Sequence, residues 1–117
     1  MKTNAQIVRE YFRRLLNEKD LSVCDEILAH DYVDHDAPDS ATPGPASTKL
    51  FVSRFLREYP DLRVEIEDIF SEGRKVAARL IWTGTHRESG ASYHRIGIVI
   101  LHLNDSGQIT GRWSAYA

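Results

Sequence analysis

The chain contains a single cysteine, Cys24, among its 117 residues. One thiol excludes an internal disulfide and a zinc site built from cysteines, and it fits a reducing cytoplasm. Because Cys24 falls within an apolar helical pattern, it is predicted to be a buried, inert core residue. No signal peptide is visible in the polar start Met1–Asn4, so we expect a cytoplasmic protein.

Clusters of one charge and long apolar runs are also missing. The net charge is −2, and the lysines and arginines are scattered along the chain. Nucleic acids and anionic membrane surfaces attract concentrated basic charge, so neither is expected as a partner. The longest apolar run, Ile96–Leu101, is far shorter than a membrane span.

Several catalytic motifs are absent as well. The sequence has no glycine-rich phosphate loop, no nucleophile elbow and no HExxH helix. Nucleotide hydrolysis, serine esterase chemistry and zincin proteolysis are therefore not supported, and no cofactor is expected. A hydrophobic fraction of 42% and a length of 117 residues are ordinary for one globular domain covering residues 1–117.

The first sixty residues predict three helices. Thr3 or Asn4 can cap the first helix, and Pro60 ends the third. Apolar residues recur at helical spacing in three segments, Ile7–Leu16, Leu21–Leu28 and Pro45–Tyr59. The segment Ala29–Pro45 reads as a loop, punctuated by prolines.

Strand patterns follow the helices. Alternation begins at Leu62, and three longer strands are expected at Arg74–Thr85, Ser92–Leu103 and Gln108–Tyr116. Helices first and strands last predict an α+β fold, in which a curved mixed or antiparallel sheet packs on the three helices around a cone-like cavity. Since both faces of the strands are apolar, we expect the helices to cover one face and a second subunit, in a homodimer, to cover the other.

Histidines are the main candidates for chemistry. His86, His94 and His102 share parity with residues expected to face inward, such as Trp82 and Ile100. Imidazole titrates near neutral pH and can move a proton in an apolar cavity. The hypothesis is that His35 or His86 is the acid or base, oriented by Asp34 or Asp36. The alternative for each histidine is a structural or surface role.

Short motifs along nearly the whole chain resemble the SnoaL-like polyketide cyclase family. They are Tyr32-Val-Asp-His35-Asp-Ala-Pro38, Tyr59-Pro-Asp-Leu62, Gly73-Arg-Lys-Val76, Thr83-Gly-Thr-His86 and Gly107-Gln-Ile109 through Trp113. The resemblance implies the nuclear-transport-factor-2-like cone, also seen in ketosteroid isomerase, and a ligand inside it. This chain departs from the family pattern at three positions where carboxylates are common, near Val99, at Gly111 and at Ala117.

Two functions follow from this resemblance. The first is an enzyme of the cyclase or isomerase type, with His-based acid–base chemistry on a small, largely apolar carbonyl or polyketide-like ligand. The second is a non-catalytic binding or dimerisation module, which the missing carboxylates favour. The side chains expected to line the cone are Tyr32, Trp82, Tyr93, His94, His102 and Trp113. For Trp82 and Trp113, ordinary core packing is the alternative.

Two further charged features have simpler interpretations. Asp34, His35 and Asp36 are adjacent on an extended loop, where neighbouring side chains diverge, so no metal site is predicted there. Arg79 lies in the middle of a strand. It either binds a ligand oxygen inside the cone or faces outward and pairs with Glu65 or Glu67, and the outward pairing is preferred.

Overall fold

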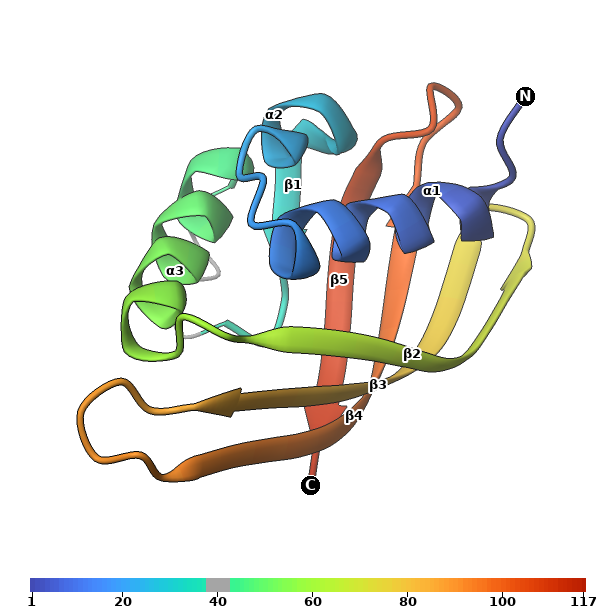
Figure 1. Cartoon of the computed structure of the whole chain (residues 1–117). Coiled ribbons are helices and arrows are strands. Elements are labelled where there is room, and N and C mark those ends of the chain that lie inside the picture. Colours follow the sequence, from blue (N-terminus) through green and yellow to red (C-terminus); the bar gives the residue numbers. More distant parts are fainter. Residues whose placement is uncertain (38–42) are drawn as a thin grey trace.

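The computed structural model describes residues 1–37 and 43–117. Three α-helices and a strongly curved five-stranded sheet enclose one hydrophobic core, which confirms the predicted α+β class. The helices are α1 (Asn4–Phe12), α2 (Val23–Ile27) and α3 (Pro45–Glu58), and a short π-helix, η1 (Arg13–Asn17), continues α1. In Figure 1, α1 crosses the concave side of the sheet and α3 lies beside β1.

The sheet has the strand order β1-β5-β4-β3-β2. Its strands are β1 (Leu28–Asp34), β2 (Arg63–Glu72), β3 (Lys75–Thr85), β4 (Ser92–Leu103) and β5 (Ile109–Tyr116). The four C-terminal strands pair antiparallel, whereas β1 pairs parallel to β5. The sheet is therefore mixed, and it curls around the helices (Figure 1).

β1 corrects the prediction that Ala29–Pro45 is a loop. Leu28, Ala29 and Tyr32 are buried, while His30 and Asp31 are exposed, so the segment lacks the strict alternation by which a strand is recognised. A register shift between Leu28 and Val33 in the pairing with β5 explains the broken pattern. The middle of the expected loop, residues 38–42, lies outside the described part.

Local hydrogen bonds set the position of the first helix. Thr3 caps α1, and its hydroxyl accepts from the Gln6 N–H at 3.1 Å while the Gln6 side chain accepts from the Thr3 N–H at 2.8 Å. At the other end, the Asn17 amide bonds the backbone N–H and C=O of Val64 at 2.9 and 3.0 Å. These bonds fasten η1 to β2.

The core lies between the helices and the concave face of the sheet. It contains Val8, Phe12 and Leu16 from the first helical segment together with Leu80, Val99, Leu101 and Ile109 from the sheet. Cys24 belongs to this core, and burial, then Asp25, raises the pKa of its thiol to about 12. The thiol is therefore protonated and inert, as predicted. No described helix is long and apolar enough to cross a bilayer.

Replacement of Leu80 by alanine tests this core. Leu80 is 0% exposed, and the cavity left by Leu80→Ala should lower the free energy of unfolding by about 2–5 kcal/mol. The same change at Leu50, which is 50% exposed on α3, should alter it by less than about 0.5 kcal/mol. Urea unfolding followed by circular dichroism measures both, and equal losses would contradict the assigned core.

Candidate functional site

Alternation along β4 decides which side chains can reach the interior of the cone. Gly97, Val99, Leu101 and Leu103 are buried against the helices, whereas Ile96, Ile98 and Ile100 are 41%, 55% and 43% exposed. The odd-numbered residues of β4 therefore face inward, and the even-numbered residues form the outer face of the sheet.

This parity corrects the expectation that His94, His102 and Trp113 line the cone. His94 and His102 are even-numbered residues of β4, and Trp113 pairs with the outward Ile100. All three lie on the outer face. The prediction was wrong because both faces of β4 are apolar, so the sequence did not show which face the helices cover.

His35 also lies on the outer face. Its imidazole stacks on the Trp113 indole, with ring centroids 4.1 Å apart and planes 4° from parallel. The centroid of the His102 ring lies 4.5 Å from that of the same indole, and the two planes are tilted by 48°. Trp113 thus touches two imidazoles outside the cone, and the interior acid–base role predicted for His35 has no geometric support.

His86 occupies a different place, just after β3 at the β3–β4 turn. Its Nδ1 accepts the backbone N–H groups of Glu88 and Ser89, both at 3.3 Å. Its ring stands edge-on to Tyr59, with centroids 5.3 Å apart. Because Nδ1 accepts, the neutral ring carries its proton on Nε2, where it can donate to a neighbouring group.

An aromatic cluster fills the end of the cone beneath the C-terminal half of α3. It consists of Phe55, Tyr59, Trp82, Tyr93 and Tyr116. The Phe55 ring lies 5.2 Å from Tyr93 and 6.4 Å from Trp82, and Trp82 lies 6.3 Å from Tyr116. Tyr59 and Tyr93 are 5.1 Å apart. Trp82 and Tyr93 therefore lie inside the cone, in contact with other rings rather than with an open cavity.

Gly97 provides the space for one ring of this cluster. A Cβ atom at position 97 would lie 2.2 Å from Cδ1 of Tyr116 and 2.9 Å from the Ala115 carbonyl oxygen. No side chain fits at that separation, so the Tyr116 ring lies directly on the Gly97 backbone.

Arg112 is the inward residue that the sequence analysis missed. It pairs across the sheet with the inward Leu101. Its Nη2 donates to the Tyr116 hydroxyl at 2.7 Å, and its guanidinium carbon lies 5.9 Å from the centre of the Phe12 ring. Its Nε is buried and has no hydrogen-bond partner. Neighbouring side chains of a strand point to opposite faces, so the assignment of Trp113 to the interior placed Arg112 outside.

The charge of Arg112 persists inside the cone. Burial acts to lower the pKa of its guanidinium, but Tyr116, Tyr32, Tyr11 and Asp34 act to raise it, and the net shift is upward. Arg112 forms no ion pair with any carboxylate of the described residues. The interior therefore holds a permanent cation without a directly bonded counterion.

Two tyrosines beside Arg112 stay protonated. Burial raises the pKa of Tyr32 to about 12 and that of Tyr11 well above its ordinary value. The Tyr11 hydroxyl and the Trp82 Nε1 are both buried without a hydrogen-bond partner. Most buried polar atoms in proteins are paired. Three buried donor atoms, the Tyr11 hydroxyl, the Trp82 Nε1 and the Arg112 Nε, therefore lack an acceptor among the described residues.

Asp34, His35 and Asp36 diverge, as the loop geometry predicted. Asp34 interacts electrostatically with Arg112 and Tyr11, whereas His35 lies on the outer face. The Asp36 carboxylate accepts the Ser114 N–H at 2.6 Å. Within residues 1–37 and 43–117, no three metal-binding side chains converge. Asp34 makes no described hydrogen bond to His35 or His86, so the predicted orienting contact is not present.

Arg79 faces outward, as preferred, but its partner differs from the prediction. Its guanidinium bonds the Asp68 carboxylate at 3.0 Å instead of Glu65 or Glu67. The register of β2 shifts between Ile66 and Asp68, which brings Asp68 opposite Arg79. An exposed pair of this kind contributes little to stability.

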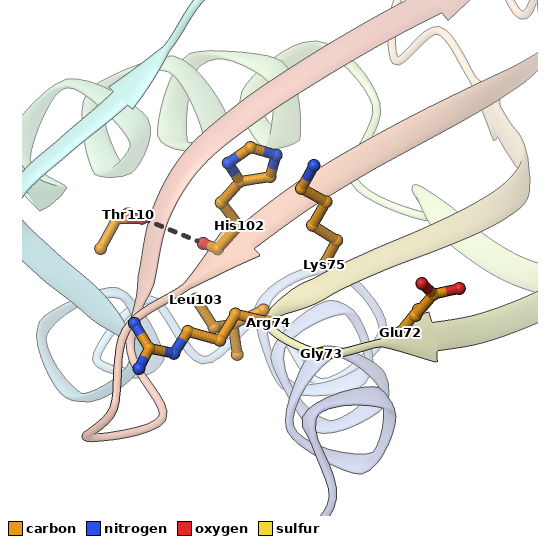
Figure 2. Close-up of a pocket in the computed structure, with 7 residues that line it drawn as sticks. All are labelled: Glu72, Gly73, Arg74, Lys75, His102, Leu103 and Thr110. Atoms are coloured by element: carbon orange, nitrogen blue, oxygen red, sulfur yellow. Dashed lines mark hydrogen bonds between the residues drawn. The ribbon is translucent and has the colours of Figure 1, made fainter.

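Two pockets lie away from the aromatic cluster. One, of about 690 Å³, is open and lies where the β2–β3 turn meets the ends of β4 and β5; its lining includes Arg74, Lys75, His102 and Thr110. Figure 2 shows the Lys75 and His102 side chains on the same side of this pocket. The second, of about 320 Å³, lies between the first helix and β2 and is lined by Arg9, Phe12, Arg13, Asn17, Val64 and Ile66.

The arrangement of three helices and a curled mixed sheet defines the nuclear-transport-factor-2-like class of folds. Within that class, the family model of SnoaL-like polyketide cyclases matches residues 6–116. The chain belongs to the SnoaL-like polyketide cyclase family. The resemblance identified from the motifs is thereby confirmed.

Solved structures agree with this membership. A proposed polyketide cyclase from Bacillus cereus ATCC 10987 is 27% identical, with a TM-score of 0.82 over 97% of this chain and 73% of that one. TsrD from Streptomyces laurentii is 22% identical (TM-score 0.86, 99% and 90% covered). A SnoaL-like polyketide cyclase from Agrobacterium tumefaciens strain C58 is 20% identical (TM-score 0.85, 100% and 93% covered). No curated protein sequence matches the chain.

The outer-face histidine His102 should make stability depend on pH. Burial, followed by Lys75 and His35, lowers its pKa below the ordinary 6.5. Above pH 6.5 neither the folded nor the unfolded chain holds this proton. As the pH falls, the unfolded chain binds it first, so the free energy of unfolding should decrease until the folded imidazole also becomes protonated.

Urea unfolding between pH 8 and pH 5 measures this effect. The variant His102→Gln should lose part of the decrease below pH 6.5, whereas His94→Gln, at an exposed position on the same strand, should retain it. If the free energy of unfolding of His102→Gln decreased with acid as much as that of the wild type, the effect could not be assigned to His102.

Proposed function

We propose that the aromatic end of the cone binds a small, largely apolar carbonyl or polyketide-like molecule. The observation that carries the proposal is the cluster of Phe55, Tyr59, Trp82, Tyr93 and Tyr116. Unlike the aliphatic core, four of its five rings are only partly buried. Partly buried rings can rotate away with little loss of packing and then form flat walls for a planar guest.

The neighbouring polar groups suit a carbonyl guest. The Tyr11 hydroxyl and the Trp82 Nε1 are buried donors without acceptors, and a carbonyl oxygen is an acceptor. Donors held in an apolar interior stabilise the negative charge that develops on such an oxygen during enolisation. Enolisation is a step shared by aldol-type cyclisation and ketone isomerisation, so the proposal accommodates either reaction.

Two groups can move the proton in an enzyme of this kind. Asp34 is the carboxylate that interacts through space with Arg112 and Tyr11, and in the proposed enzyme it accepts a proton from a carbon atom of the guest. His86, at the end of the cone beside Tyr59, carries its proton on Nε2 and can donate it. Asp34 thus replaces His35 as the base, and His86 becomes the proton donor.

The two indoles allow a direct test of the binding site. Trp82 lies inside the cone and Trp113 on the outer face. Addition of 2-acetylnaphthalene, a flat neutral ketone, should shift the Nε1–H resonance of Trp82 in ¹H–¹⁵N spectra and leave that of Trp113 in place. Trp82→Phe and Trp113→Phe assign the two signals. A saturable shift confined to Trp113, or no shift at all, would refute binding in the cone.

Turnover can be tested without knowledge of the natural substrate. In D₂O, the protein should accelerate exchange of the α-protons of 2-tetralone above the rate in buffer, as followed by ¹H NMR. Asp34→Asn should reduce the acceleration by about 10²–10⁴-fold if Asp34 is the general base. His94→Gln, at an exposed outer position, serves as the control. Binding without acceleration would select the non-catalytic module.

The outer face supports the second candidate, a dimerisation module. The exposed Ile96, Ile98 and Ile100 all lie on β4, and the cross-strand rows Ala77–Ile100–Trp113, Arg79–Ile98–Ala115 and Ile81–Ile96 flank them with residues of β3 and β5. A contiguous apolar surface of this kind is uncommon on monomers. Because it is centred on one strand, the same patch on a second copy can cover it across a two-fold axis.

Charge introduced at the centre of this patch should separate the subunits. Ile98→Glu would bury two unpaired carboxylates in the interface, so analytical ultracentrifugation should show a monomer where the wild type is a dimer. Leu50→Glu, at an exposed apolar position on α3, should leave the dimer intact. A monomeric wild type at micromolar concentration would exclude the homodimer.

A further inference from the structure

We infer that the cone selects ligands carrying an ionised oxygen, which Arg112 binds from inside the sheet. This inference rests on the proposed binding of an apolar guest and specifies its chemistry. The ligand is an oxyanion, a carboxylate or an enolate or phenolate, attached to a flat apolar body.

The Arg112 guanidinium lies inside the curve of the sheet. Arg112 lies on the inward face of β5, between the Phe12 ring of the first helix at 5.9 Å and the Tyr116 hydroxyl at 2.7 Å. Both contacts leave the Nε–H buried and unused. A buried charge is costly unless it is paired, and a buried donor without an acceptor adds to that cost. A bound oxyanion removes both costs at once.

Arg112 lacks a directly bonded counterion among the described residues. The guanidinium makes no ion pair within residues 1–37 and 43–117, although Asp34 affects it through space. Arg95, whose guanidinium carbon lies 5.6 Å from the centre of the Tyr116 ring, is exposed to solvent and does not belong to this interior. The one cation of the interior among the described residues is therefore Arg112, and its charge favours an anionic guest.

Two neutral donors pack close to the ring contacts of Arg112. Tyr11 packs on Phe12 at 5.3 Å, and Trp82 packs on Tyr116 at 6.3 Å, so each lies one ring away from an Arg112 contact. The Tyr11 hydroxyl and the Trp82 Nε1 lack acceptors. Burial keeps Tyr11 protonated at neutral pH. The group contains one cationic donor and two neutral donors, which suits an oxygen atom that carries negative charge.

A matched pair of probes separates this inference from the proposed function. 2-Naphthoate and its methyl ester share one flat ring system and differ in the ionised oxygen. Isothermal titration calorimetry should show that wild-type protein binds naphthoate at least about tenfold more tightly than the ester. Equal affinities would overturn the oxyanion inference and leave binding of apolar guests intact. If neither probe binds, both proposals fail.

Variants locate the charge. Arg112→Gln should abolish the preference for naphthoate, whereas Arg95→Gln, which removes the more exposed arginine on the other side of Tyr116, should change it by less than about twofold. Loss of the preference only in Arg95→Gln would overturn the assignment to Arg112.

A wild-type measurement guards against misfolding of the Arg112 variant. The Nε–H resonance of Arg112 should move downfield when naphthoate binds, because a free donor becomes hydrogen-bonded. The methyl ester should leave it unchanged. If naphthoate binds measurably and the Arg112 Nε–H resonance does not move, the inference is also overturned.

Discussion

The parallel pairing of β1 with β5 is the constraint on which the interior of this protein depends. The His35 N–H donates to the Arg112 carbonyl at 2.8 Å, and the Ser114 N–H donates to the Asp36 carboxylate at 2.6 Å. These bonds fix β1 beside β5 at one register. That register directs Tyr32 and Asp34 towards Arg112 and leaves His35 on the outer face against Trp113. A shift by one residue would exchange the two sets.

The composition of the cone determines what chemistry it can support. Its core is built from apolar residues such as Leu80, Val99 and Ile109, and its polar groups lie among aromatic rings. These are mainly donors, since burial keeps Tyr11 and Tyr32 protonated and Arg112 retains its charge. Such an interior stabilises negative charge on a guest far better than it removes a proton. The carboxylate Asp34 is the exception, which gives it the only basic role in the proposed enolisation.

Sequence alone predicted the larger features of the fold because their signals are local. The Thr3 cap, the helical stripe that ends at Leu16 and the four long strands each follow from spacing within one segment. β1 was missed because its pattern is irregular and its partner, β5, lies about eighty residues away. Pairing across that distance leaves no trace in local periodicity.

The candidate site was harder to predict for a related reason. Tyr32, Trp82 and Tyr93 were assigned to the interior, but His94, His102 and Trp113 were placed on the wrong face. Isoleucines occupy one face of β4, and Val99, Leu101 and Leu103 occupy the other, so hydrophobicity does not distinguish the two. The wrong choice hid Arg112, whose position beside Trp113 would otherwise have marked it as a buried charge. The face is set by the helices, which the strand sequence does not encode.

The close approach of Tyr116 to the Gly97 backbone has an evolutionary consequence. The two positions share a single volume, so a side chain gained at 97 requires both a smaller residue at 116 and a shift of the backbone at Ala115. Substitution histories at these sites should be correlated among relatives. Relatives with a larger residue at 97 and a smaller one at 116 would keep the fold of the sheet. They would lose the Tyr116 hydroxyl, which accepts from Arg112, and their ligand preference would therefore differ.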